Sequence, residues 1–269
     1  MRWYTSMKPN NDCEYDFFGQ IAVADTLEAC GRAAIPFLSH RFSAQSVLAL
    51  GFHQSASPEI HFSWIPDPGL RTTFDHAYAR LGYMLDPFYQ HSWLTQDIAT
   101  WLVRDIAPDR FESSQYFANY FAATEMVDDM GLIVRLSANR AVHLSLGRSS
   151  GHRRFRTKDL RSFDQIAKVL APKLRALLIP QTPQTTPVMP SLDQRFIYLA
   201  QADGKKISQR EAQVAALIVQ GYSSRAIALK LGISIHTVKV HRRALYRKLT
   251  ITSQSELFGL LTRSSQMSK

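Results

Sequence analysis

The sequence has little cysteine and no long apolar run, and both shortages exclude classes of protein. Its two cysteines, Cys13 and Cys30, are not grouped with each other or with histidines. A disulfide framework or a zinc site is therefore not expected, and a reducing cytoplasm is the natural setting. The most apolar early stretch, residues 21–38, is interrupted by three charged residues. We expect no signal peptide and no membrane span.

Several catalytic patterns are also missing. The sequence has no GxxxxGK phosphate loop, no HExxH zinc-protease motif and no dinucleotide-binding glycine pattern. We therefore expect a protein that is not an enzyme, with no metal site and no cofactor. An enzyme would become the better hypothesis if the fold brought His and Asp or Cys together in a cleft.

The last quarter of the chain is short of acidic residues. Residues 204–269 hold twelve Lys and Arg against only Glu211 and Glu256. Residues 1–203 hold 20 residues of each sign, so the whole formal net charge of +10 lies in the last quarter. A neutral body joined to one strongly basic module indicates a polyanion as partner.

Residues 208–261 are predicted to form four short helices. Capping-box pairs, Ser208 with Glu211 and Ser253 with Glu256, mark the starts of the first and the last. The second and third helices are separated only by "LGIS", which is typical of a helix-turn-helix. In that motif the second helix of the pair enters the major groove of DNA, and the first helix braces it.

The third of these helices lies within "GISIHTVKVHRRALYRKL", residues 232–249, and has two different sides. Val238, Leu245 and Leu249 fall on one narrow arc of a helical wheel. The other side carries His236, Lys239, Val240, Arg243 and Arg247. Most basic helix faces are only solvated, but the charge distribution and the motif favour contact with DNA here.

Residues 207–257 resemble the LuxR-type helix-turn-helix domain. The matching positions are Arg210-Glu211, Val214, Gly221, Ile227-Ala228, Leu231, Ser234, Thr237-Val238-Lys239, His241 and Lys248-Leu249, with departures at Ile207 and Ser208. The resemblance implies that Lys239, Val240 and Arg243 face base edges. We expect Arg225 and Arg247 to contact phosphates, and we include His236 and Thr237 among the DNA-binding candidates.

A proline-rich stretch divides the chain. "IPQTPQTTPVMPS", residues 179–191, has four prolines and no charge, as in a partly extended linker. We predict a sensor domain over residues 1–178, a linker over 179–203 and a DNA-binding domain over 204–269.

The fold class predicted for the whole chain is α+β. In the first domain, helical periodicity near residues 17–40 precedes two strand-like segments, a hairpin follows near 131–148, and an amphipathic helix spans 157–178. This order predicts a PAS- or GAF-like α/β sandwich, an antiparallel sheet covered by helices, followed by an all-α four-helix domain.

Residues 74–101 are dense in aromatic side chains and contain Asp86-Pro87. This stretch resembles the autoinducer-binding domains of LuxR-type quorum sensors. Phe74, Tyr78, Asp86 and Trp101 can be laid on the family's Trp, Tyr, Asp and Trp pattern, although the Tyr–Asp interval is one residue short. A carboxylate suits the amide N–H of an acyl-homoserine lactone, and Tyr or Trp donors suit its carbonyls. The ligand-binding candidates are Phe74, Tyr78, Tyr83, Asp86 and Trp101.

Three functions remain open for the first domain: a small-molecule sensor, an acyl-homoserine-lactone receptor, or a module controlled by a protein partner. A closed core, with the aromatics as packing and Asp86 as a helix cap, would favour the last. We expect binding of double-stranded DNA as a homodimer, because one recognition helix reads only a few base pairs. The final helix, with Leu257, Leu260 and Leu261, is the candidate dimer contact.

Overall fold

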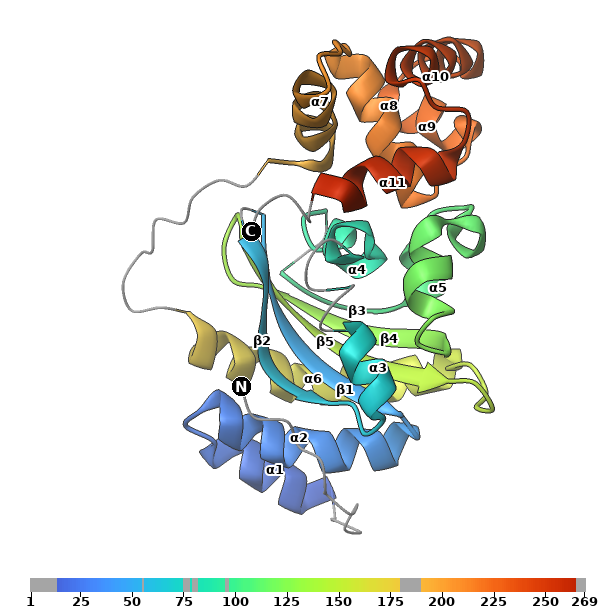
Figure 1. Cartoon of the computed structure of the whole chain (residues 1–269). Helices are drawn as coiled ribbons and strands as arrows, with labels where there is room; N and C mark the ends of the chain where they lie inside the picture. The colour runs from blue at the N-terminus through green and yellow to red at the C-terminus, as the bar shows by residue number, and fades with distance from the viewer. Residues whose placement is uncertain are drawn as a thin grey trace.

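The computed structural model describes residues 14–54, 56–74, 78, 82–94, 97–179 and 190–264. Two helices open the chain, followed by a sheet interleaved with short helices and closed by one long helix (Figure 1). The elements of this first domain are α1 (Glu14–Val23), α2 (Leu27–Phe42), β1 (Ser46–His53), β2 (Ala56–Trp64), α3 (Pro68–Thr73), η2 (Gly82–Leu85), α4 (Pro87–His91), β3 (Ile98–Leu102), α5 (Val103–Ile106), η3 (Phe111–Ser113), η4 (Phe117–Phe121), β4 (Met126–Arg135), β5 (Arg140–Ser149) and α6 (Thr157–Leu178).

The sheet has five strands in the order β2-β1-β5-β4-β3, and every neighbouring pair is antiparallel. The predicted hairpin is confirmed as β4 and β5, with Leu132 opposite Leu144. The sequence analysis missed β3, a five-residue edge strand that pairs only with β4 in this sheet. Such a short strand carries too few residues for its alternation to stand out.

The two faces of the sheet belong to different cores. On one face α1, α2 and α6 cover apolar residues such as Val47, Leu132 and Leu144 (Figure 1). The predicted amphipathic helix is confirmed as α6, which buries Phe163 and Leu170 against this face. The other face carries the α3, α4 and η4 segments and a second apolar cluster. The first domain is therefore an α+β layer structure, as predicted.

The C-terminal domain is all helical, as predicted, but it has one more helix than the sequence analysis placed there. Its elements are α7 (Leu192–Ala202), α8 (Gln209–Gln220), α9 (Ser224–Leu231), α10 (Ile235–Leu249) and α11 (Gln254–Ser264). The additional helix, α7, falls within the predicted linker, 179–203, and packs on α8 with Leu192 and Phe196 buried. The proline-rich signal concealed its start, Ser191, which forms a capping box with Gln194. Residues 180–189 of that linker lie outside the described residues.

Local signals explain the boundaries of the C-terminal helices. The Ser208 side chain accepts a hydrogen bond from the Glu211 amide at 3.2 Å, and Glu211 accepts from the Ser208 amide at 2.7 Å. Gly221 ends α8 with φ of 98°, and Gly232 ends α9 with φ of 63°. Both lie in the left-handed region that glycine adopts without steric cost. Gly221 thus begins the turn between α8 and α9, and Gly232 begins the turn between α9 and α10.

The last helix does not have the spare apolar face that the sequence analysis expected. Leu257 and Leu261 are both fully buried in the core of the C-terminal domain, and Leu260 is half-buried against it. The expectation of a dimer contact through Leu261 is therefore wrong. The domain needs these leucines because α11 packs against both α7 and α8.

The burial of Leu261 predicts a large effect of a charge at this position. Leu261→Glu should destabilise the chain by at least about 3 kcal/mol, because it removes a buried leucine and places a carboxylate in an apolar core. Urea unfolding followed by circular dichroism measures this. The matched control is Leu229→Glu, because Leu229 is 77% exposed on α9. Equal stability of the two variants would contradict the core assignment.

Candidate DNA-binding surface and sensor cavity

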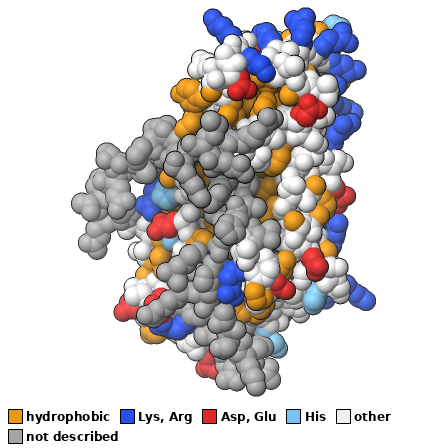
Figure 2. All heavy atoms as spheres, in the orientation of Figure 1, with side chains coloured by type: hydrophobic (Ala, Val, Ile, Leu, Met, Phe, Trp, Pro, Cys, Tyr) orange, Lys and Arg blue, Asp and Glu red, His pale blue; other side chains and the backbone are white. Residues whose placement is uncertain are grey.

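The α10 helix presents the predicted basic face to solvent. Val238, Leu245 and Leu249 are buried, so the apolar arc packs inward. Six of the seven DNA-binding candidates are exposed: Arg225 on α9, and His236, Lys239, Val240, Arg243 and Arg247 on α10. Spacings of three or four residues place the α10 candidates on one side of the helix. Figure 2 shows Lys and Arg side chains gathered at the end of the molecule where Figure 1 places α10.

Thr237, the seventh candidate, has a local role. It is half-buried, and its amide donates to the Ser234 hydroxyl at 2.9 Å, with the two hydroxyl oxygens 2.8 Å apart. Ser234 is the N-cap of α10. Thr237 thus helps to fix the start of the helix that carries the exposed cations.

Three other cations of the basic domain are engaged inside the protein. Lys248 lies 2.8 Å from the buried Glu211 carboxylate, and Lys205 donates to the Leu249 carbonyl at 2.8 Å. Arg210 donates to the Leu231 carbonyl at 2.6 Å, which ties α8 to the end of α9. Burial opposes ionisation of Glu211, but hydrogen bonds from Lys248 and Ser208 lower its pKa overall. Some cations of the C-terminal domain therefore hold its helices together, and others form the exposed basic face of α10.

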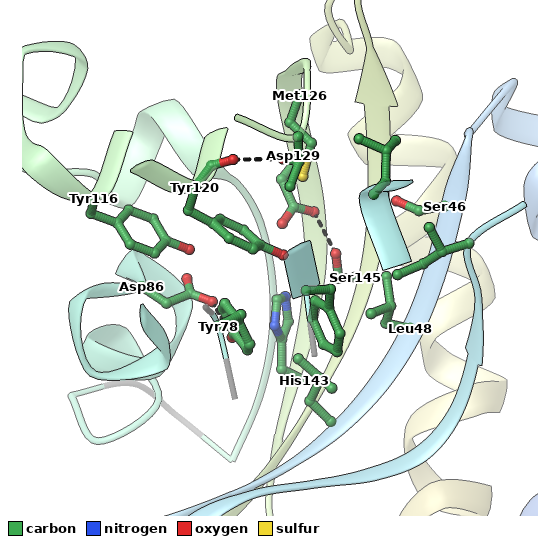
Figure 3. Close-up of a pocket in the computed structure, with 15 residues that line it drawn as sticks. Ser46, Leu48, Tyr78, Asp86, Tyr116, Tyr120, Met126, Asp129, His143 and Ser145 are labelled. Carbon is green, nitrogen blue, oxygen red and sulfur yellow. Dashed lines mark hydrogen bonds between the residues drawn. The ribbon is translucent and has the colours of Figure 1, made fainter. Parts of the chain in front are cut away.

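A small cavity lies on the face of the sheet opposite α6, between the strands and the α3, α4 and η4 segments (Figure 3). Its volume is about 40 Å³, which accommodates only a few water-sized groups. The lining residues are Ser46, Leu48, Leu50, Ile65, Leu70, Phe74, Tyr78, Asp86, Tyr116, Tyr120, Thr124, Met126, Asp129, His143 and Ser145. The cavity is apolar at its β1 side and polar where tyrosines meet carboxyl groups.

Asp86 is the buried N-cap residue of α4, and its carboxyl group has two hydrogen-bond partners. One carboxyl oxygen accepts from the Phe88 amide at 2.8 Å and caps the helix, and the other accepts from the Tyr78 hydroxyl at 2.5 Å. Burial raises the pKa of Asp86 to about 6, against the effect of these hydrogen bonds. The capping role proposed from the sequence is confirmed, and it coexists with a position in the cavity wall.

A second buried carboxyl group, Asp129 on β4, faces the same cavity. It accepts a hydrogen bond from the Ser145 hydroxyl at 2.9 Å. Burial and, next, the nearby Asp86 raise the pKa of Asp129 well above its ordinary value. His143 precedes Ser145 by two residues on β5 and lies on the same face of the sheet. It is 1% exposed, and burial lowers its pKa to about 3. Asp129, His143 and Ser145 thus form a polar floor of the cavity, although most other buried residues of β4 and β5 are apolar.

The structure brings three of the five ligand-binding candidates together. Phe74, Tyr78 and Asp86 line the cavity, and the Phe74 and Tyr78 rings stack at 5.0 Å. Tyr83 and Trp101 do not line it. Trp101 lies on β3, where its ring contacts His91 at 5.0 Å.

The sequence analysis missed the residues that come from η4, β4 and β5. They are Tyr116, Tyr120, Asp129, His143 and Ser145. Alternation along β5, with Val142, Leu144 and Leu146 facing α6, places His143 and Ser145 on the other face. A polar residue at an inward position of a hydrophobic strand was the signal that could have revealed them.

The two domains touch through the segment that follows α5. The Arg110 amide donates to the Gly221 carbonyl at 3.1 Å, and the Asp109 carboxylate accepts from the Ser223 amide at 2.9 Å. Gln115 donates to the Ser255 hydroxyl at 3.0 Å. A side chain added at Gly221 would come within 3.0 Å of Ser114. The contact therefore falls at the end of α8, the start of α9 and the start of α11.

Residues 147–151, "GRSSG", have the spacing of the hydrolase nucleophile motif GxSxG. In that motif the serine occupies a sharp turn from a strand into a helix. Here Ser149 still pairs with Met126 inside the sheet, and α6 begins only at Thr157. The geometry does not fit a nucleophile elbow. Within the described ranges, no three His, Cys, Asp or Glu side chains are grouped as metal ligands, and no helix is long and apolar enough to cross a membrane.

The buried acids predict a distinctive pH dependence. A carboxyl group whose pKa is raised by folding favours the folded state at low pH and loses that contribution as pH rises. Asp129→Asn should therefore gain stability relative to the wild type as pH rises above about 4, by at most about 1.4 kcal/mol per pH unit. The lowered pKa of His143 has the opposite effect, because it disfavours the folded state at pH values below the ordinary pKa of histidine. His143 is present in both proteins, so its effect cancels in the comparison.

Chemical denaturation of both proteins between acid and neutral pH measures this difference. Parallel stability curves would mean that Asp129 does not ionise with a raised pKa in the folded state. The hydroxyl groups of Tyr78, Tyr116 and Tyr120, whose pKa values burial raises, titrate only in alkali and do not enter this range.

Known proteins resemble this chain in both of its domains. Residues 205–261 match the model of the family described as bacterial regulatory proteins, luxR family. A protein named as an HTH-type transcriptional regulator in the exeN 3′ region of Aeromonas salmonicida is 29% identical over 184 residues, which cover 65% of this chain and 92% of that protein. The response regulator protein TmoT of Ectopseudomonas mendocina is 30% identical over 40% of this chain, and the match spans only 44% of its length.

The first domain is similar in fold to a solved structure. The LBD domain of VqsR from Pseudomonas aeruginosa superposes with a TM-score of 0.51 and 24% identity, over 62% of this chain and 98% of that one. This similarity shows the fold alone. Residues 205–261 are therefore a domain of the luxR family of bacterial regulatory proteins, and they follow a first domain whose fold is similar to that of the VqsR LBD domain.

Proposed function

We propose that the protein controls transcription by inserting α10 into the major groove of DNA under the control of its first domain. The observation that carries this proposal is the exposed basic face of α10, backed by a buried apolar arc in a luxR-family domain. A helix with this division can lie in a groove without losing its own core contacts. The protein then acts in the cytoplasm, where bacterial DNA is found.

Individual roles follow from position on the helices. Lys239, Val240 and Arg243 point from the exposed side of α10 and read base edges. Arg225 and Arg247 hold phosphates, since they lie at the flanks of that face. His236 serves either role, and Thr237 contributes mainly by fixing the helix start through Ser234. Phosphate contacts orient the module, whereas base contacts give it sequence preference.

The first domain acts as a sensor for a small molecule. The cavity supports this, because buried carboxyl groups and an unpartnered imidazole around one cavity are costly unless they serve a ligand. An acyl-homoserine lactone is a less suitable ligand for this structure, because a volume of about 40 Å³ holds only a small group. Control by a protein partner would need no such cavity.

The segment from Asp109 to Phe121 connects the cavity with the DNA-binding domain. One end bonds to Gly221 and Ser223, and the other end carries Tyr116 and Tyr120 in the cavity wall. Clefts of about 420 and 590 Å³ flank the contact between the domains, so the contact is loose. A ligand that moves the two tyrosines would therefore shift the position of α8 and α9.

The domain division proposed here is a sensor unit ending with α6 and a DNA-binding unit beginning with α7. The homodimer expected for such regulators does not use Leu261, which is buried. The half-buried Phe258 and Leu260 on α11, or a surface of the sensor domain, are the remaining choices. Pairing of two half-sites about one helical turn apart would supply the specificity that one α10 helix lacks.

The proposed division of labour on DNA is testable by two substitutions. Arg243→Ala should cost about 1–3 kcal/mol on the specific site and reduce sequence preference, if it makes a bidentate base contact. Arg225→Ala should weaken specific and random DNA about equally. Titration of each variant against both DNAs at one salt concentration separates the cases. An equal loss on both DNAs for Arg243→Ala would remove it from the base-reading set.

The proposed contact between the domains predicts a change in backbone protection. Asp109→Ala removes the acceptor of the Ser223 amide, so hydrogen exchange of that amide should accelerate about twofold to tenfold. The matched control is Glu112→Ala, because Glu112 pairs with Arg154 of its own domain at 3.2 Å. Exchange measured on the peptide around residue 223 gives the result. Unchanged protection in Asp109→Ala would show that the domains do not dock in this way in solution.

A further inference from the structure

The sensor cavity contains two carboxyl groups but no cation among the residues that the structure describes. Asp86 and Asp129 are 5% and 7% exposed and come from opposite walls, the start of α4 and β4. Each contributes to the electrostatic environment of Tyr116 and Tyr120 between them. Arg104 pairs with the neighbouring Asp128 at 3.0 Å and not with Asp129. Within the described residues, the two acids are thus buried without a positive partner, which is rare in a folded protein.

His143 supplies an independent sign that the cavity serves a ligand. It is 1% exposed, lines the cavity, and has no hydrogen-bond partner at Nδ1 or at Nε2. Figure 3 shows its ring pointing from β5 toward the space between Tyr78 and Tyr120. Its ring also stacks on Phe88 at 4.2 Å, so it is held in place. A neutral imidazole in this position offers one acceptor nitrogen to a donor in the cavity.

The wall between the two acids is aromatic. The rings of Phe74, Tyr78, Tyr120 and Tyr116 follow one another with centroid distances of 5.0, 4.9 and 5.4 Å. Such rings attract a cation through their negative faces, most strongly where water is excluded. An aromatic wall combined with buried carboxylates is chemically suited to organic ammonium groups.

We propose that this cavity binds the ammonium group of a small organic amine, placed between Asp86 and Asp129 with His143 as a further acceptor. The inference rests on the proposed role of the first domain as a small-molecule sensor. An ammonium group has three N–H donors, one for each acid and one for the imidazole, and its positive charge offsets one carboxylate. Its carbon chain lies toward Leu48 and Leu50 at the apolar side.

Other classes of ligand fit less well. A carboxylate or phosphate would face two acids without any described cation to hold it. A neutral amide, as in an acyl-homoserine lactone, could donate to one carboxyl group but would give neither of them a charge partner. The volume of about 40 Å³ also favours a head group of few atoms.

The experiment compares three probes with the same butyl chain that differ only in their head group: n-butylamine, n-butanol and pentanoate. N-octanoyl homoserine lactone is a fourth. Binding to the full chain is measured by calorimetry at constant ionic strength, up to millimolar concentrations, and DNA binding is measured in parallel. We expect n-butylamine to bind and the alcohol and the carboxylate not to bind. Absence of n-butylamine binding would overturn the proposal.

Variants of the two acids locate the site. Asp129→Asn should weaken n-butylamine binding by at least about tenfold, because one buried charge partner is lost. Asp86→Asn should do the same while keeping the helix cap, since asparagine caps well. The control is Asp105→Asn, which removes an exposed carboxylate of α5 outside the cavity. Circular dichroism checks that each variant is folded, and equal affinity in all three variants would exclude the cavity.

The outcomes separate this inference from the proposed function. If the lactone or the alcohol binds and n-butylamine does not, the sensor role stands and the ammonium site is wrong. If n-butylamine binds and both acid variants lose it, but DNA binding does not respond, the ammonium site stands and control of DNA binding by this ligand is wrong.

Discussion

Period-two alternation along β1, β4 and β5 is the constraint on which the first domain depends. Because successive side chains face opposite sides, one face can be sealed by α1, α2 and α6 while the other is left for a different purpose. Met130, Leu132 and Leu144 complete the sealed face. If β4 were shifted by one residue against β5, the side chains of β4 would change faces and Asp129 would lie under α6 instead. The register of the strands therefore determines which residues form the cavity.

The polar floor of the cavity is maintained at the expense of stability. Asp129 has one side-chain hydrogen bond, from Ser145, and His143 has none, although both are buried. An apolar pair of similar volume would pack as well and would avoid the desolvation of a carboxyl group. Gly131, opposite Ser145, is needed for the same reason, since an added Cβ would come within 2.4 Å of His143 Nε2. The sheet is shaped around a polar site that its own folding does not require.

Sequence patterns predicted most of the secondary structure, because the relevant signals are local. Residues 157–178 have the amphipathic period of α6, and Ser208 and Gly221 mark the ends of α8. The short edge strand β3 and the helix α7 were missed, since one has too few residues and the other follows a proline-rich stretch. Phe74, Tyr78 and Asp86 lie within thirteen residues of one another and were found. Tyr120, Asp129 and His143 meet them only through tertiary structure, which a linear pattern does not contain.

The excess of Lys and Arg in the C-terminal domain has two roles. Lys205, Arg210 and Lys248 bond to carbonyls or to Glu211 and hold α8, α9 and α10 at fixed angles. The exposed cations on α10 can then act as a rigid set, which is what recognition of a groove demands. The described part of the sensor loop beside the cavity meets this rigid unit through Asp109, Arg110 and Gln115. Because these contacts reach the end of α8, the start of α9 and α11, the proposed control by the first domain would act on the whole unit, α10 included, rather than on a single helix.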